Sequence, residues 1–242
     1  YVGTSGFSYP GWAPRFYPRG LRDDGLLRHY ASRFPAVELN NTYYQQPSAA
    51  KVAGWLAATP PAVRFVVKAQ RGGTFRLFTG AAEGAGWLTA PLRAFGARLG
   101  AVFLRVPGQV SRDDARLDAL LAAWPGDLPL VCDFQHPSWH DDEVFDRLRA
   151  AGAALCATEL PEDDESPTIR LIGGFLYLRL RRLEYAPAEL EAWAARLAPF
   201  LEAGHDVFVF FRHDETGRAT EYAAGLRSAV ELGLRRPTRQ GR

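Results

Sequence analysis

The sequence predicts an α/β fold, and specifically a TIM-type (β/α)8 barrel, from three observations. Eight short apolar segments recur along the 242 residues, and a longer segment with helical spacing fills nearly every gap between them. The short segments are apolar throughout, which is typical of parallel strands covered by helices. Eight such units in a chain of this length match a TIM barrel. A doubly wound open sheet is the alternative, but Gly3–Gly6 does not lead straight into a helix as a nucleotide-binding turn does.

Each strand is predicted where a short apolar run lies between segments of helical spacing. In chain order the strands are Val2–Ser5, Ala36–Asn40, Arg64–Ala69, Ala101–Val106, Leu128–Phe134, Ala153–Thr158, Gly174–Leu180 and Asp206–Phe211.

Helices are predicted from the spacing of apolar residues and from capping residues such as Ser48, a good N-cap. They span Gly25–Phe34, Ser48–Ala58, Pro91–Leu99, Asp114–Trp124, Asp141–Ala151, Pro187–Ala203 and Gly217–Leu232. A Gly-rich loop is expected after the third strand. The acidic, proline-bounded stretch Leu160–Pro167 has no helical pattern, so the sixth strand is expected to lack a regular helix after it.

No internal repeat or low-complexity linker divides the chain. We therefore expect a single barrel domain, residues 1–234, followed by a basic C-terminal tail, residues 235–242. The formal net charge is only +2, and the tail alone contributes four arginines. Overall charge therefore gives no argument for a nucleic-acid partner.

Two features indicate a cytoplasmic protein with no membrane partner. No apolar run approaches the roughly 18–20 residues that span a bilayer, and Tyr1–Thr4 shows no basic stretch leading into a long apolar run, so no secretory signal is visible. The only cysteines, Cys132 and Cys156, lie inside predicted strands and fit buried structural thiols better than a disulfide framework. The oligomeric state stays open.

Polar side chains stand at every predicted strand end, where a TIM barrel carries out its chemistry. Polar groups there are costly unless they are paired or face a cavity, so we predict a polar pocket. Both asparagines of the chain, Asn40 and Asn41, and one of its two lysines, Lys68, fall in this ring. The candidates for substrate binding are Ser5, Tyr9, Trp12, Asn40, Tyr43, Arg105, Asp133, Trp139, Arg179, Arg181 and Arg212.

Three residues of the ring are candidates for catalysis: Glu38, Lys68 and His136. An inward lysine can form a Schiff base, act as a base or bind an anion. Lys68 can equally form a structural ion pair with Glu38 on the neighbouring strand. The arginines of the set are expected to hold an anion. The aromatic residues are expected to wall the site, with loop packing as the alternative, which is favoured for Trp12.

Metal-assisted hydrolysis is one alternative activity, because acids and a histidine on several strands can supply oxygen and nitrogen ligands. The set in question is Glu38, Asp133, His136 and Glu159. Serine and thiol hydrolysis are excluded, since no Gly-x-Ser-x-Gly elbow follows a strand and both cysteines lie in strand interiors. The chain also lacks a Gly-x-x-x-x-Gly-Lys-[Ser/Thr] phosphate loop, and no motif identifies a cofactor.

Distinctive motifs are spread over essentially the whole chain. They are Gly3–Trp12, Phe16–Pro18, Tyr30–Phe34, Val37–Tyr44, Phe65–Lys68, Phe134–Trp139, Tyr177–Leu180 and Phe210–Asp214. Together they resemble the YecE-like family, known as domain of unknown function 72 (DUF72). The resemblance implies a TIM barrel, in agreement with the strand count, and it implies no established reaction.

The chain departs from the family pattern at several strand ends. Phe75 and Arg181 stand where the family usually has histidine, and Arg105, Arg181 and Arg212 stand where neutral or titratable groups are usual. An arginine cannot donate and retrieve a proton near neutral pH. We therefore expect a divergent member, with an altered substrate or with a pocket kept for binding only.

The function predicted from the sequence is the binding of an anionic or phosphate-bearing small molecule at the C-terminal mouth of the barrel, by an enzyme of unassigned reaction. Two alternatives remain. One is the metal-assisted, nuclease-like hydrolase, and the other is a non-catalytic module that binds nucleic acid or another ligand through the arginines and the basic tail.

Overall fold

The computed structural model describes residues 1–79, 84–162 and 165–235. All eight strands are parallel and follow one another around a ring in the order β1-β8-β7-β6-β5-β4-β3-β2. They are β1 (Val2–Thr4), β2 (Ala36–Leu39), β3 (Arg64–Lys68), β4 (Leu99–Val106), β5 (Leu130–Phe134), β6 (Ala154–Glu159), β7 (Phe175–Leu180) and β8 (Asp206–Phe211). The predicted TIM-type barrel is confirmed.

The ring closes between its first two strands at the residues that begin the site. Ser5 forms a parallel bridge with Glu38, and the Gly6 amide donates to the Glu38 carbonyl at 2.8 Å. Glu38 is therefore fixed by its backbone at the point where β1 and β2 meet.

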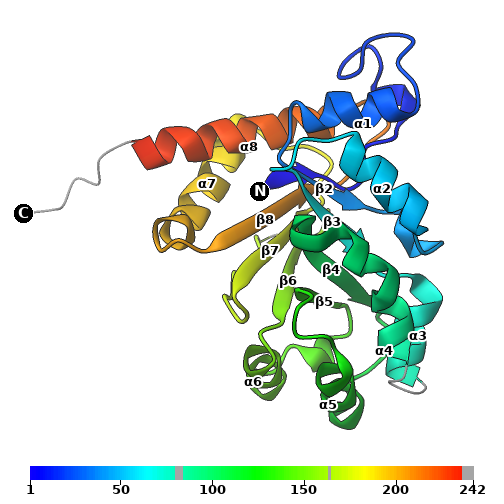
Figure 1. Cartoon of the computed structure of the whole chain (residues 1–242). Coiled ribbons are helices and arrows are strands. Elements are labelled where there is room, and N and C mark those ends of the chain that lie inside the picture. The colour runs from blue at the N-terminus through cyan, green and yellow to red at the C-terminus, as the bar shows by residue number, and fades with distance from the viewer. Residues whose placement is uncertain (80–83, 163–164, 236–242) are drawn as a thin grey trace, which may run out of the picture.

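The helices lie outside the ring of strands (Figure 1). They are α1 (Asp24–Ala31), α2 (Ala49–Ala57), α3 (Arg71–Thr79), α4 (Gly84–Thr89), α5 (Asp114–Ala123), α6 (Asp142–Ala150), α7 (Pro187–Glu202) and α8 (Arg218–Arg235). The predicted N-cap of α2 is confirmed, because the Ser48 hydroxyl accepts from the Lys51 amide at 3.2 Å. None of the described residues between β6 and β7 lies in a helix, as the acidic stretch predicts.

The segment after β3 differs from its prediction. The expected Gly-rich loop contains α3, and the first turn of this helix includes Gly72 and Gly73. The Gln70 side chain accepts from the Gly73 amide at 2.6 Å. A Cβ on Gly73 would lie 2.9 Å from the Leu88 side chain, so glycine allows α3 and α4 to pack closely. The predicted helix Pro91–Leu99 is instead a 3₁₀ segment, Ala90–Arg98, interrupted at Gly96 by a positive φ of 54°.

Two groups of buried side chains hold the barrel together. A large group packs the strands against the helices, and a smaller one, which includes Phe103, Tyr177, Phe208 and Phe210, fills the barrel interior. Tyr177 stands at the top of that interior packing and carries its hydroxyl up to Glu38 at 2.6 Å. The hydrophobic interior therefore ends directly at a buried carboxylate.

The last two features of the fold are the hydropathy of its helices and the C-terminal end of the chain. Among the described residues, no helix has the length and apolar character needed to cross a membrane. Of the predicted basic tail, 235–242, only Arg235 lies within the described residues, where it ends α8.

Candidate functional site

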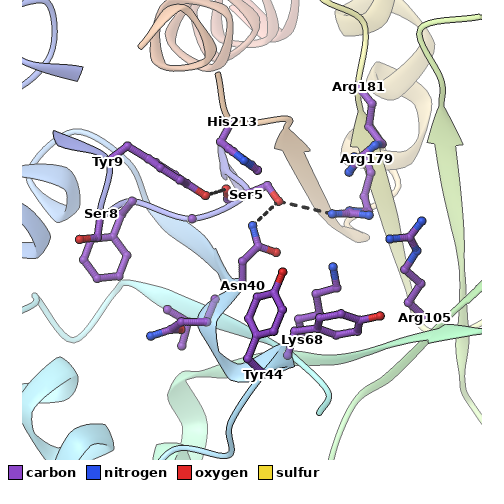
Figure 2. A pocket seen from close by; sticks show the side chains of 15 residues that line it. Ser5, Ser8, Tyr9, Asn40, Tyr44, Lys68, Arg105, Arg179, Arg181 and His213 are labelled. Atoms are coloured by element: carbon purple, nitrogen blue, oxygen red, sulfur yellow. Dashed lines mark hydrogen bonds between the residues drawn. The ribbon is translucent and has the colours of Figure 1, made fainter. Parts of the chain in front are cut away.

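A cavity of about 480 Å³ opens at the C-terminal ends of the strands (Figure 2). Its wall is formed by the segments that follow β1 and β2 and by residues at the ends of β3, β4, β7 and β8. The predicted site residues that line it are Ser5, Tyr9, Asn40, Tyr43, Lys68, Arg105, Arg179 and Arg181. The barrel thus brings together side chains that lie far apart in the sequence.

A buried ion pair between Glu38 and Arg179 lies at the base of the cavity. Arg179 Nη2 donates to Glu38 Oε1 at 2.9 Å, and both side chains are almost completely buried. One of the roles predicted for Lys68, on the adjacent strand, is a structural ion pair with Glu38. That pairing is wrong, because β2 and β7 both direct these side chains to the barrel interior, where Arg179 reaches the carboxylate across it.

Three neutral groups complete this network. Glu38 accepts a hydrogen bond from the Ser5 hydroxyl at 2.7 Å and from the Tyr177 hydroxyl at 2.6 Å. Ser5 in turn accepts from Asn40 Nδ2 at 2.8 Å. Buried polar groups connected in this way hold one another in fixed positions. The base of the cavity is therefore preorganised.

The charge state of Glu38 follows from these contacts. Burial acts to raise its pKa, but Arg179, Tyr177 and Ser5 outweigh burial and hold the pKa below its usual value. Glu38 is therefore ionised at neutral pH and already accepts from three donors. The geometry favours a carboxylate that positions Arg179 and Ser5 over one that exchanges protons with a ligand.

Lys68 ends β3, and its amine points into the cavity (Figure 2). Its side chain is largely buried, and its Nζ lies 4.3 Å from the centre of the Tyr43 ring. The Thr42 hydroxyl donates to the Lys68 carbonyl at 2.7 Å and fixes the strand end. Within the part of the chain that the structure describes, no carboxylate lies within ion-pair distance of Lys68.

The surroundings of Lys68 oppose its positive charge. Burial, followed by the charge of Arg179, lowers the pKa of Lys68 to about 8. Arg105 and Arg181 act in the same direction, and Glu38 acts in the opposite one. Lys68 therefore loses its proton much more readily than an exposed lysine, whose pKa is about 10.4.

Arg181 and Arg105 add two more cations to the same wall. Burial and the nearby Arg179 lower the pKa of Arg181 to about 10, and no ion pair of Arg181 is found among the described residues. The nearest approach of Arg105 to an acid is 3.9 Å, from its Nε to Oδ2 of Asp133. This distance is too long for a hydrogen bond. The described residues that line the cavity include Lys68 and three arginines but no aspartate or glutamate, so the wall carries net positive charge.

Several buried polar atoms at this end of the barrel are unsatisfied. Asn40 Oδ1, Arg105 Nε, Asp133 Oδ2 and Arg179 Nε have no hydrogen-bond partner among the described residues. Buried polar atoms are rarely left in this state, and a bound molecule or ordered water usually satisfies them.

Two tryptophans expected in the wall lie elsewhere. Trp12 and Trp139 are both completely buried. The Trp12 indole donates to the Asp214 carbonyl at 2.7 Å, and Trp139 donates to the Val110 carbonyl at 2.8 Å and stacks on Phe134. Their prediction as wall residues is wrong, because both rings pack the loops beneath the surface, and for Trp12 the structure shows the loop packing that the sequence favoured as the alternative.

The residues of the alternative metal site are also dispersed. His136 Nδ1 lies 2.8 Å from the Ser138 hydroxyl and caps a 3₁₀ turn, and Glu159 accepts from Tyr185 and pairs with Arg182. Among the described residues no three His, Cys, Asp or Glu side chains are placed to hold a metal ion. His136 is also absent from the cavity lining, so the geometry gives it no contact with a ligand there.

Two further predicted residues lie next to the cavity rather than in its lining. Asp133 is buried below the mouth and accepts from the Thr158 hydroxyl at 3.3 Å. Arg212 is exposed and lines a neighbouring hollow with Arg182 and Tyr185.

The cavity also contains residues that the predicted set omits. His213 lines it and stacks on Tyr9, with ring centres 4.7 Å apart, and Tyr44 and Ser8 are further members. Burial and then Arg181 and Arg212 lower the pKa of His213, so its imidazole is neutral at neutral pH. Its position just after β8 was the available signal, since every strand end of a TIM barrel faces the same mouth.

Comparison with known proteins agrees with this architecture. A solved DUF72 family protein of Enterococcus faecalis superposes with a TM-score of 0.76 at 19% sequence identity, covering 95% of this chain and 94% of that one. Another, from Thermotoga maritima, gives a TM-score of 0.75 at 25% identity and covers 96% and 98%. The UPF0759 protein YunF of Bacillus subtilis is 24% identical over 96% of this chain and 95% of its own length.

The family follows from a match that covers nearly all of the sequence. The family model described as "Protein of unknown function DUF72" matches residues 1–241. The motifs at the strand ends, the eight-stranded barrel and this match agree, and the chain belongs to the DUF72 family.

Proposed function

We propose that the mouth of the barrel binds an anionic small molecule, with a phosphate or a similar compact anion held by Lys68, Arg105 and Arg181. One observation carries the proposal. These three cations line a single cavity, and in the described part of the chain the only carboxylate within ion-pair distance of any of them is Asp133, at 3.9 Å from Arg105.

Electrostatics explains why such a wall needs an anion. Cations that are partly removed from water repel one another strongly, because the effective dielectric constant there is well below that of water. Burial first, and then the charge of Arg179 and its neighbours, lowers the pKa values of Lys68 and Arg181. A bound anion relieves the repulsion, and guanidinium groups hold phosphate or carboxylate with paired hydrogen bonds.

The polar base of the cavity supports the same function. Ser5 and Asn40 are fixed by the Glu38–Arg179 network, and the buried Asn40 Oδ1 has no hydrogen-bond partner among the described residues. Tyr9, Tyr43 and Tyr44 supply flat apolar surface beside the cations. A small organic molecule with an anionic group at one end and hydroxyl or ring atoms at the other fits this combination.

The proposal is tested by thermal unfolding in sodium phosphate and in sodium chloride at matched ionic strength. A ligand at ten times its dissociation constant stabilises a protein by about 1.4 kcal/mol. For a domain of this size that is a rise of about 3–6 °C in melting temperature. Equal melting temperatures in the two salts would show that the cavity does not bind phosphate.

Two variants test whether the stabilisation by phosphate arises in this cavity. Arg181→Ala should remove most of the difference between phosphate and chloride, and Lys51→Ala, which removes an exposed lysine on α2, should leave it unchanged. Arg179→Ala is a poor test because it would leave Glu38 buried without its cation.

A further inference from the structure

We propose that Lys68 is a nucleophile that forms an imine with the carbonyl group of an anionic aldehyde or ketone bound in this cavity. The inference rests on the proposed function, since Arg105 and Arg181 are the groups that would hold the anionic end of that molecule. It adds a covalent step and names the substrate class as a carbonyl compound that carries phosphate or a similar anion.

The position of Lys68 meets the first requirement of such a residue. Its amine stands inside the cavity, and the strand end that carries it is held by Thr42, whose hydroxyl donates to the Lys68 carbonyl. The side chain is only 8% exposed but opens to the cavity rather than to the packed interior. A carbonyl carbon held by the neighbouring cations is thereby placed next to a fixed amine.

The second requirement is an amine that is free to react. Many buried lysines are tied to a carboxylate, but in the described structure Glu38 is bonded to Arg179, Ser5 and Tyr177 instead. The contact that remains for the amine is the face of the Tyr43 ring. Tyr43 supports the charged form, but it leaves the nitrogen free to take a new bond once the proton has left.

The third requirement is a lone pair at working pH, because only the neutral amine attacks a carbonyl. Burial first, and then the charge of Arg179, bring the pKa of Lys68 to about 8. About a tenth of the amine is then unprotonated at pH 7, against less than a thousandth for an exposed lysine with a pKa of about 10.4.

The step is balanced without a further reactant. The neutral Lys68 nitrogen forms a bond to the carbonyl carbon, and the π bond of the carbonyl group breaks. One proton of that nitrogen moves to the carbonyl oxygen to give a carbinolamine. Loss of that oxygen as water, with the second proton of the nitrogen, leaves the C=N double bond. His213 lines the same cavity and has a neutral imidazole that can relay these protons.

The test traps the imine with a reductant. The full chain is incubated with glycolaldehyde phosphate and sodium cyanoborohydride, which delivers hydride to the imine carbon and leaves a stable secondary amine. Proteolysis and mass spectrometry then locate the adduct. The chain has only two lysines, so the exposed Lys51 is an internal reference in the same sample.

We expect Lys68 to be modified at least tenfold faster than Lys51. Inorganic phosphate should slow the modification of Lys68 alone. Unphosphorylated glycolaldehyde should modify Lys68 much more slowly than glycolaldehyde phosphate does. Modification of Lys51 at an equal or greater rate would overturn the proposal. Lys68→Arg removes the nucleophilic amine, so it should lose the adduct at this position while the slow modification of Lys51 stays unchanged. If phosphate stabilises the wild-type chain but no adduct forms on Lys68, the imine alone is rejected. If the wild-type chain shows neither stabilisation by phosphate nor an adduct, the anion site is rejected as well.

Discussion

Replacing Glu38 with glutamine removes the charge that compensates Arg179 inside the barrel. The substitution preserves the size of the side chain, and its amide oxygen can still accept from Ser5 or Tyr177. Arg179, however, remains buried with an exposed fraction of only 3% for the whole residue. Asp133, which also acts on the charge of Arg179, forms no ion pair with it in the described structure.

The magnitude follows from the burial of both partners. Removing one member of a buried ion pair costs about 3–5 kcal/mol, because the other charge is left without compensation. For a domain of this length the loss corresponds to a fall of about 6–20 °C in melting temperature. An exposed pair gives the comparison: Asp127→Asn, which breaks the Arg93–Asp127 ion pair at the surface, should cost no more than about 1 kcal/mol.

The effect also has a defined pH dependence. The surroundings of Glu38, in which Arg179 and two hydroxyl donors outweigh burial, lower its pKa in the folded state. The stability that its charge contributes is therefore present above the unfolded pKa of about 4.3 and is lost as pH falls through the lower folded value. The difference between wild type and Glu38→Gln should be full at pH 7 and shrink below about pH 4.

Urea unfolding followed by circular dichroism measures these differences. A loss in Glu38→Gln no larger than that in Asp127→Asn would refute the assignment of a buried, stabilising charge network. The double variant Glu38→Gln with Arg179→Met removes both charges, and it should recover part of the stability that the single variant loses.

The remaining predictions concern the thiols, the cavity lysine and a loop tryptophan. Burial raises the pKa of Cys132 to about 12 and that of Cys156 well above its usual value. A thiol reagent should therefore label both cysteines far more slowly in the native protein than in urea, and equal labelling rates would contradict their burial in the strands. Burial and neighbouring guanidinium groups lower the pKa of Lys68 to about 8, so the rise in melting temperature caused by phosphate should decline as pH increases above that value, where phosphate itself stays a dianion, and Lys68→Arg should lack this decline. Trp12→Phe should lower stability by about 1–2 kcal/mol and leave the phosphate effect unchanged, and a lost phosphate effect would return Trp12 to the cavity wall.

The parts of the fold that the sequence predicts well are those set by local pattern. The strands of a parallel barrel are buried on both faces, so their apolar runs stand out from the helical spacing around them. The helix α3 was missed because Gly72 and Gly73 have low helix propensity. Their cost is offset by the cap from Gln70, which is a local contact from a residue type that is not among the usual N-caps, and by close packing against Leu88 of α4, which is a tertiary contact.

The site, like the fold, is only partly predictable from the sequence. The TIM-barrel topology alone predicts that Ser5, Lys68 and Arg181 meet at one mouth, although they are far apart in sequence. It does not determine which side chains cross the barrel interior, so the pairing of Glu38 with Arg179 could not be read from strand order. Nor does a tryptophan in a loop indicate by its type whether it packs inward or faces a ligand.

The central claim, that this cavity binds an anion, is tested most directly by isothermal titration calorimetry of the full chain with sodium phosphate at constant ionic strength. We expect saturable binding at a single site in the wild-type chain and in Lys51→Ala. Arg181→Ala should weaken this binding at least tenfold, because one cation of the cavity wall is lost. Absence of saturable heat in the wild-type chain, or equal affinity in Arg181→Ala, would contradict the claim that the cavity binds an anion.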